Sequence, residues 1–111
     1  MSQKQKHTIV LIQDTDYRNS RTYYDYPTIT AAMNGISSIF EHKLTEKTRK
    51  RSHKHDINEI YNFIDNLTDI SCLILDLKTN EYSPRTRKWI KERILTHFKN
   101  FAQKNKSKHM N

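Results

Sequence analysis

The sequence predicts an α+β fold in which a four-stranded antiparallel sheet carries three amphipathic helices on one face, in the order ββααββα. Three observations lead to this prediction. Residues 7–13 form a short apolar run rich in β-branched side chains, residues 29–44 repeat apolar side chains at helical spacing, and residues 70–77 form a second apolar run. A chain of 111 residues without an internal repeat is typical of one domain.

The first predicted strand, residues 7–13, is apolar on both sides. Ile9 and Leu11 point to one face of the sheet, and Val10 and Ile12 point to the other. A sheet that meets water on one side shows polar residues there, so this strand is expected at the centre of a sheet covered on both faces. Fully burying each such side chain is worth roughly 1.5 to 3 kcal/mol. Ile9 and Leu11 therefore imply a partner surface.

Residues 21–26 are expected to form the second strand, antiparallel to the first, because they contain a threonine and three tyrosines after a short polar connection. Pro27 ends this strand, and Thr28 is positioned to cap a helix. The apolar positions of that helix follow a 3.6-residue period: Ile29, Ala32, Met33, Ile36, Ile39, Phe40 and Leu44. Gly35 within it indicates close packing against the sheet.

Residues 45–55 contain no large apolar side chain and are predicted to form a basic loop. Its cations are Lys47, Arg49, Lys50, Arg51 and Lys54. A capping box that begins at Asp56 then opens a second helix. The inward side of that helix is expected to carry Ile57, Ile60, Tyr61, Ile64 and Leu67.

Residues 70–77 are predicted to form the third strand, which is again apolar on both faces. A turn leads into a fourth strand at residues 81–83, and Pro84 restricts that strand to an edge of the sheet. Thr86 is expected to cap the third helix. Its apolar side carries Trp89, Ile90, Ile94, Leu95, Phe98 and Phe101.

Three helices are enough to cover one face of the predicted sheet, and no further element remains for the other face. The simplest solution is a second copy, packed sheet against sheet in an isologous dimer. We expect residues 1–6 to be a disordered basic N-terminus, residues 7–102 the single domain, and residues 103–111 a disordered basic tail.

A formal net charge of +8 favours an acidic partner, which leaves nucleic acid, an acidic protein segment or an anionic membrane surface open. The alternative is that basic tails and one basic loop supply the excess without a partner. The polar N-terminus does not resemble a signal peptide, and no apolar run approaches the ~18 residues of a membrane span. We therefore expect a soluble intracellular protein. The single cysteine, Cys72, fits a buried structural thiol in a reducing compartment.

No catalytic, cofactor or metal site is predicted. One glycine in the chain excludes a glycine-rich phosphate loop, and Cys72 lies mid-strand without a neighbouring histidine. His53 and His55, with His42, form the only local histidine cluster, but Lys54 and the lack of cysteine or carboxylate partners oppose a dication.

Direct RNA or DNA binding through the basic loop and the tails is the alternative function. The loop cations would contact phosphates or act as a nuclear import signal. Tyr23, Tyr24, Tyr26 and Tyr82 would then be stacking platforms for bases, or packing groups if their face of the sheet is an interface.

The ordered motifs of the chain resemble the enhancer of rudimentary family. They are HTIVLIQ (7–13), RTYYDY (21–26), MNGI (33–36), FIDNLTDISCL (63–73), YSP (82–84) and KWIKERI (88–94). The resemblance implies a small nuclear protein, present also in the cytoplasm, that homodimerises through its sheet and has no catalytic site. It further implies an adaptor that docks peptide segments of RNA-processing and transcription proteins in splicing, mRNA elimination and microRNA maturation. Links to the cell cycle and to pyrimidine biosynthesis are also implied, and nucleic acid would be contacted only through partners.

Particular residues follow from this resemblance. The dimer contacts of the first strand fall on Ile9 and Leu11. An acid-directed phosphorylation site falls on Thr22, where Asp25 supplies the acid. A second such site would fall on Thr28, but Ala31 stands where the acid is needed.

Overall fold

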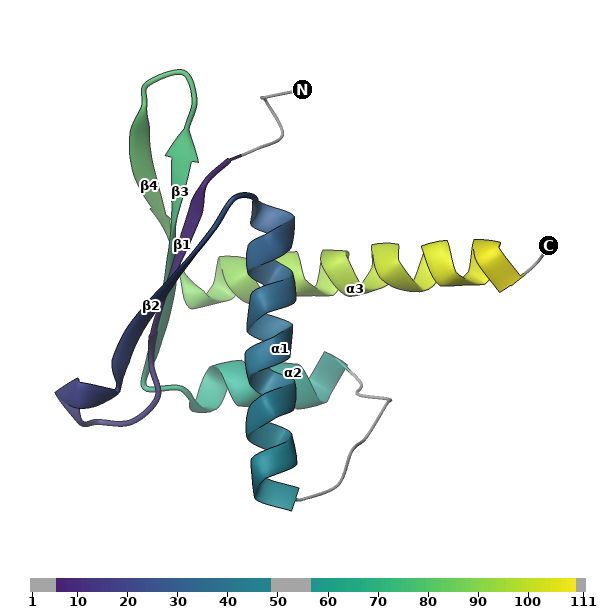
Figure 1. Cartoon of the computed structure of the whole chain (residues 1–111), viewed down its shortest axis with the longest axis horizontal. Helices are drawn as coiled ribbons and strands as arrows, with labels where there is room; N and C mark the ends of the chain where they lie inside the picture. Colours follow the sequence, from purple (N-terminus) through teal and green to yellow (C-terminus); the bar gives the residue numbers. More distant parts are fainter. Residues whose placement is uncertain (1–5, 49–56, 110–111) are drawn as a thin grey trace.

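The computed structural model describes residues 6–48 and 57–109 of the chain (Figure 1). The elements in order are β1 (Thr8–Gln13), the short 3₁₀ turn η2 (Arg18–Ser20), β2 (Arg21–Tyr26), α1 (Ile29–Thr48), α2 (Ile57–Asn66), β3 (Asp69–Asp76), β4 (Glu81–Arg85) and α3 (Arg87–His109). The predicted order ββααββα is confirmed.

The four strands form one sheet in the order β2-β1-β3-β4, with every neighbouring pair antiparallel. β1 and β3, the two strands that are apolar on both sides, are central. β4 is an edge strand, as Pro84 requires, because proline cannot donate to a further neighbour. Val10 lies opposite Tyr24 on one side and Cys72 on the other, which fixes the register of the three strands.

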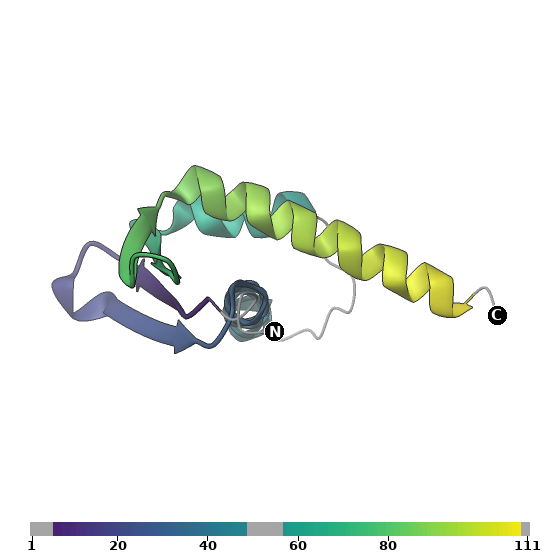
Figure 2. The ribbon, with the colours of Figure 1, turned by 90° about the horizontal axis from the view of Figure 1, so that it is seen from above.

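The helices lie together on one side of the sheet, as two perpendicular views show (Figures 1 and 2). The core between the layers combines the inward side chains of β1 and β3 with the apolar stripes of the helices. Its buried members are Val10, Ile12, Ala32, Met33, Ile36, Phe40, Ile60, Ile64, Leu67, Ile70, Cys72, Ile90 and Ile94. All three predicted helical stripes therefore contribute to the core.

Two local predictions about α1 are confirmed. Thr28 caps the helix, since its Oγ1 accepts a hydrogen bond of 2.9 Å from the backbone N–H of Ala31. Gly35 is in close packing with β2, because a Cβ atom there would overlap the ring and hydroxyl of Tyr26. The missing side chain lets the helix approach the edge strand.

α3 is joined to the end of α2 by charged side chains. Nη2 of Arg87 donates to the carbonyl oxygens of Leu67 (3.0 Å) and Thr68 (3.3 Å), which lie in the turn that follows α2. Nζ of Lys91 lies 2.8 Å from a carboxylate oxygen of Asp65. These contacts hold the turn into β3 against the third helix.

Several element ends differ from the prediction. β1 begins at Thr8, β3 begins at Asp69, and β4 continues through Pro84 to Arg85. α1 continues to Thr48, so the predicted basic loop does not begin at residue 45; no glycine or proline interrupts the helix there. α3 runs to His109, past the end of its apolar stripe, because its last residues are mostly good helix formers. β3 ends at Asp76, whose side chain accepts the N–H of Lys78 to begin a turn. The predicted domain limits themselves stay predictions, and residues 1–5 lie outside the described residues.

Candidate interaction surface on the outer sheet face

The sheet has one face turned away from the helices, which we call the outer face. Side-chain alternation and the strand register assign residues of all four strands to it. Its central residues are Ile9 and Leu11 of β1, Tyr23 and Asp25 of β2, Ser71, Leu73 and Leu75 of β3, and Tyr82 and Pro84 of β4. Most of these side chains are apolar, although the helices lie on the other side.

The apolar centre of the outer face is continuous across the strands. Ile9 lies opposite Leu73 of β3, and Leu11 lies opposite Tyr23 of β2. Leu73 in turn lies opposite Pro84 of β4. Leu11 is 37% exposed and Tyr23 is 68% exposed, so no other part of the described chain covers this centre. Contiguous exposed apolar patches are typical of the interaction surfaces of soluble proteins.

Polar side chains border the apolar centre at both ends of β1. At one end His7 bridges the two edge strands: its Nδ1 lies 2.7 Å from the hydroxyl of Tyr82, and its Nε2 lies 3.3 Å from Oδ1 of Asp25. At the other end Nε of Arg21 donates to Oε1 of Gln13 at 3.1 Å. An apolar core with a hydrogen-bonded polar rim is the usual anatomy of a protein–protein interface.

The structure brings Ile9 and Leu11 together on the outer face, beside Leu73. Their contact with a second copy stays a prediction. Thr22 is exposed on β2, where a kinase would reach it in the free chain. Asp25 points to the opposite face of the strand from Thr22, so the two side chains are not neighbours. Phosphorylation of Thr22 also stays a prediction.

The residues of the alternative function are not gathered in one place. Tyr23 and Tyr82 lie on the outer face, whereas Tyr24 and Tyr26 point toward the helices, so the four tyrosines do not form one stacking platform. Lys47 lies in the last turn of α1. The other loop cations lie outside the described residues: Arg49, Lys50, Arg51 and Lys54.

The described residues offer little reactive chemistry. Burial raises the pKa of the Cys72 thiol to about 12, which leaves it protonated and unreactive at neutral pH. No group of three or more His, Cys, Asp or Glu side chains in residues 6–48 and 57–109 is placed to hold a metal ion. His53 and His55 of the predicted histidine cluster lie outside this part of the chain. Among the described helices, none is long and apolar enough to cross a membrane.

Sequence reasoning missed the role of His7. The period of two that places Ile9 and Leu11 on the outer face also runs back to His7, so its face was readable from the sequence. The two partners of His7 were not readable from the sequence. Asp25 and Tyr82 lie 18 and 75 residues away and meet His7 only through the strand register.

The sequence profile of the enhancer of rudimentary family matches residues 4–104, nearly the whole chain. The chain belongs to the enhancer of rudimentary family. It is 39% identical to an enhancer of rudimentary homolog of Dictyostelium discoideum, over 87% of this chain and 98% of the relative. It is 42% identical to the homolog of Arabidopsis thaliana, over 87% and 90%. Protein enhancer of rudimentary of Drosophila virilis is 39% identical, over 79% and 86%.

Proposed function

We propose that this enhancer of rudimentary protein is a non-enzymatic homodimeric adaptor that dimerises by packing outer face on outer face. The uncovered apolar centre around Ile9, Leu11 and Leu73 is the observation that carries the proposal. A two-fold axis through this centre places the same apolar patch on both sides of the contact. The polar rim around His7 and Arg21 would then remain at the edge of the interface.

The adaptor role is supported by family membership and by the character of the described residues. A buried thiol and an apolar patch do not form a catalytic site, whereas an exposed apolar sheet face fits protein binding. The partners we propose are short segments of nuclear proteins in splicing, mRNA elimination, microRNA maturation and transcription, with links to the cell cycle and to pyrimidine biosynthesis. The protein would then act in the nucleus, without a cofactor.

Light scattering of wild type and Leu11→Arg at micromolar concentration tests the dimer. The wild type is expected to be a dimer. Leu11→Arg would place a cation beside its symmetry mate in an apolar interface, so this variant is expected to be a monomer or to aggregate. Thr22→Arg is the matched control, because it adds the same charge at an exposed position of the neighbouring strand β2, on the face of the sheet opposite to Leu11. A monomeric wild type, or a dimeric Leu11→Arg variant, would exclude the proposal.

Direct nucleic-acid binding is the second candidate, favoured by the net charge of +8. Salt separates the two functions, because binding through phosphates weakens steeply with salt and docking of an apolar segment does not. Fluorescence anisotropy with labelled single-stranded RNA at low and physiological salt is the measurement. Micromolar affinity for bare RNA at physiological salt would favour the second candidate.

A further inference from the structure

The helix side of the sheet carries a pocket that the helices do not cover. Figure 1 shows the turn between β3 and β4 extending past α3 and past the start of α1. An open pocket of about 670 Å³ lies at this end of the sheet, and none of its lining residues belongs to a helix. Its lining includes Ile74 and Asp76 of β3 and Ser83 and Arg85 of β4, which share a face with the buried Cys72. We call it the hairpin pocket.

The hairpin pocket is lined by more cations than carboxylates. Lys6, just before β1, and Lys78, in the turn after β3, contribute exposed side chains, and Arg85 contributes a half-buried guanidinium. Asp76 is the only carboxylate among the described lining residues, and Glu81, which lies opposite Asp76 on β4, is outside the lining. The lining therefore carries three positive charges against one negative charge at neutral pH.

The cations of the hairpin pocket have no counter-ion in the part of the chain that the structure describes. No carboxylate of residues 6–48 or 57–109 forms an ion pair with Lys6, Lys78 or Arg85. Oδ1 of Asp76 accepts the backbone N–H of Lys78 at 2.8 Å instead of pairing with an ammonium group. The positive charge of the pocket is therefore not cancelled within the described residues.

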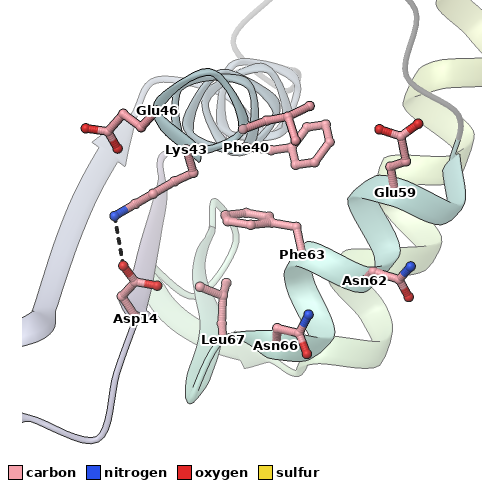
Figure 3. A pocket seen from close by; sticks show the side chains of 10 residues that line it. Asp14, Phe40, Lys43, Glu46, Glu59, Asn62, Phe63, Asn66 and Leu67 are labelled. Carbon is pink, nitrogen blue, oxygen red and sulfur yellow. Dashed lines mark hydrogen bonds and ion pairs between the residues drawn. The ribbon is translucent and has the colours of Figure 1, made fainter. Parts of the chain in front are cut away.

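A hollow of the same volume between α1 and α2 shows the opposite arrangement (Figure 3). Nζ of Lys43 lies 2.8 Å from Oδ2 of Asp14, and Oε2 of Glu46 lies 3.6 Å from Nε2 of His42. These charged groups have partners within the chain, so they do not indicate the charge of a ligand. The unpaired cations of the hairpin pocket do, and they indicate an anion.

Uncharged groups hold Arg85 in position. Its Nη1 donates to Oγ of Ser83 at 3.0 Å and to the carbonyl oxygen of Pro84 at 2.9 Å, and its Cζ lies 5.7 Å from the centre of the Trp89 ring. These partners fix the guanidinium without cancelling its charge. Nε and Nη2 donate to none of the described residues. Because the planar guanidinium matches a carboxylate, Arg85 is suited to bind one.

We propose that the hairpin pocket binds an acidic segment of a partner protein. One carboxylate of the segment would bind Arg85, and further carboxylates would face Lys6 and Lys78. Leu77, another lining residue, is 44% exposed and would pack against an apolar side chain of the segment. Asp76 would repel the evenly charged backbone of a nucleic acid, which favours a peptide.

The proposal rests on the proposed adaptor function only for the statement that the occupant is a protein segment. It does not require the dimer, since one copy of the chain supplies the lining. Light scattering on the same samples reports the dimer separately, so failure of the pocket and failure of the dimer are distinguishable.

The probe is a short fluorescein-labelled peptide rich in glutamate, with leucines between the glutamates. A second peptide carries lysine in place of every glutamate. Fluorescence anisotropy with the full chain should show binding of the glutamate peptide and weak or no binding of the lysine peptide. Amide chemical shifts in an NMR titration with the glutamate peptide should change most at Leu77, Lys78 and Arg85.

Charge removal at the two exposed lysines tests the site without touching the core. The Lys6→Gln/Lys78→Gln double variant should bind the glutamate peptide roughly tenfold more weakly, since it loses two exposed charge contacts. The Lys88→Gln/Lys99→Gln double variant is the matched control, because it removes the same charge from exposed positions of α3 outside the lining. It should change the affinity much less.

Arg85→Lys tests the guanidinium itself. The variant keeps the positive charge and removes the planar group that matches a carboxylate, so it should also bind the glutamate peptide more weakly. Thermal unfolding checks that the variant is folded, because Arg85 also contacts Ser83 and Trp89.

Three outcomes would overturn the proposal. The first is that the glutamate peptide does not bind, or binds no better than the lysine peptide. The second is an equal loss of affinity in the two double variants. The third is binding of labelled single-stranded RNA at physiological salt that shifts the same amides and is lost in Lys6→Gln/Lys78→Gln, which would make the pocket a phosphate-backbone site.

Discussion

The two faces of the sheet carry similar apolar side chains and meet different surroundings. On the inner face Val10 and Cys72 are fully buried, at 0% exposure. On the outer face Leu11 is 37% exposed, and its neighbour Tyr23 is 68% exposed. Residues 10 and 11 are adjacent on one strand, so the difference does not come from local composition. It comes from which face the helices cover.

The connections of the fold explain why one face is left open. The strand pairs β1–β2 and β3–β4 are joined directly, α1 and α2 lie between β2 and β3, and α3 follows β4. All three helices reach the same side of the sheet (Figure 2). The inner face is therefore closed by the chain itself, and its stability should not depend on protein concentration. Coverage of the outer face by a second copy would depend on concentration.

Truncation of an inner side chain should have the largest effect. Ile70→Ala removes a side chain that is 2% exposed, and it should lower the free energy of unfolding by about 2 to 5 kcal/mol. Leu11→Ala on the outer face should cost less in dilute solution. Its effect should also grow with protein concentration, because the proposed association of wild type would contribute to stability. Urea unfolding of Ile70→Ala and Leu11→Ala at two protein concentrations measures both changes in the free energy of unfolding. Equal losses in the two variants, independent of protein concentration, would contradict the difference between the faces.

Gly35→Ala tests how tightly the inner packing extends to the edge strand. The added methyl group would overlap the Tyr26 ring, so we expect a loss of about 1 to 3 kcal/mol. The helix propensity of alanine is more favourable than that of glycine by about 1 kcal/mol. Propensity alone would therefore make Gly35→Ala stabilising. The Tyr26→Leu background is the control, since a smaller side chain should relieve most of the overlap. Thermal or urea unfolding of the four combinations gives the coupling between the two sites.

Acidification should weaken the helix layer by a smaller amount. Nε2 of His97 on α3 lies 2.7 Å from Oδ1 of Asn34 on α1, and burial, aided by the nearby charge of Arg93, lowers the pKa of His97 below its ordinary value of 6.5. The unfolded chain then binds a proton more readily than the folded chain. Above the ordinary histidine pKa, the contribution of His97 to stability is fully present. It is lost as the pH falls through that ordinary pKa toward the lowered pKa of the folded state.

The His97 contribution is measured as the difference in urea midpoint between about pH 7.5 and about pH 5.5, on either side of the ordinary histidine pKa. The same difference should be smaller in His97→Gln, which keeps a hydrogen-bonding side chain but does not titrate. Other histidines and the carboxylates titrate equally in both proteins. An identical pH dependence of wild type and variant would show that His97 contributes nothing.

Thiol labelling compares the two faces of the sheet at adjacent residues of β3. It reads the reactivity of each thiol and needs no measurable change in the free energy of unfolding. Cys72 on the inner face, with its pKa raised to about 12, should not react with iodoacetamide in the folded protein at neutral pH. A cysteine introduced by Ser71→Cys lies opposite Leu11 on the outer face and should react in dilute solution. Its rate should fall as the protein concentration rises, if the dimer protects it. Mass spectrometry counts the labels, and two equally slow thiols in dilute solution would contradict an open outer face.

The amino-acid sequence determined the elements and their faces. The β-branched runs, the three helical stripes, Thr28 and Pro84 act through local geometry, so the strands, the helices, the cap of α1 and the edge position of β4 were readable from the chain. The apolar side of β1 with Ile9 and Leu11 was readable for the same reason. Period-two alternation does not depend on the rest of the fold.

The tertiary structure decided what lies next to what. The bridge from His7 to Asp25 and Tyr82 and the division of the tyrosines between two faces both depend on residues far apart in the chain. α1 and α3 also continue beyond the ends that the sequence predicts, because an apolar stripe marks where a helix packs and not where its hydrogen bonds stop. Sequence periodicity records burial along one element. The register of the strands, the crossing of the helices and the coverage of a sheet face arise only when several elements share one core, since each element then constrains the position of the others.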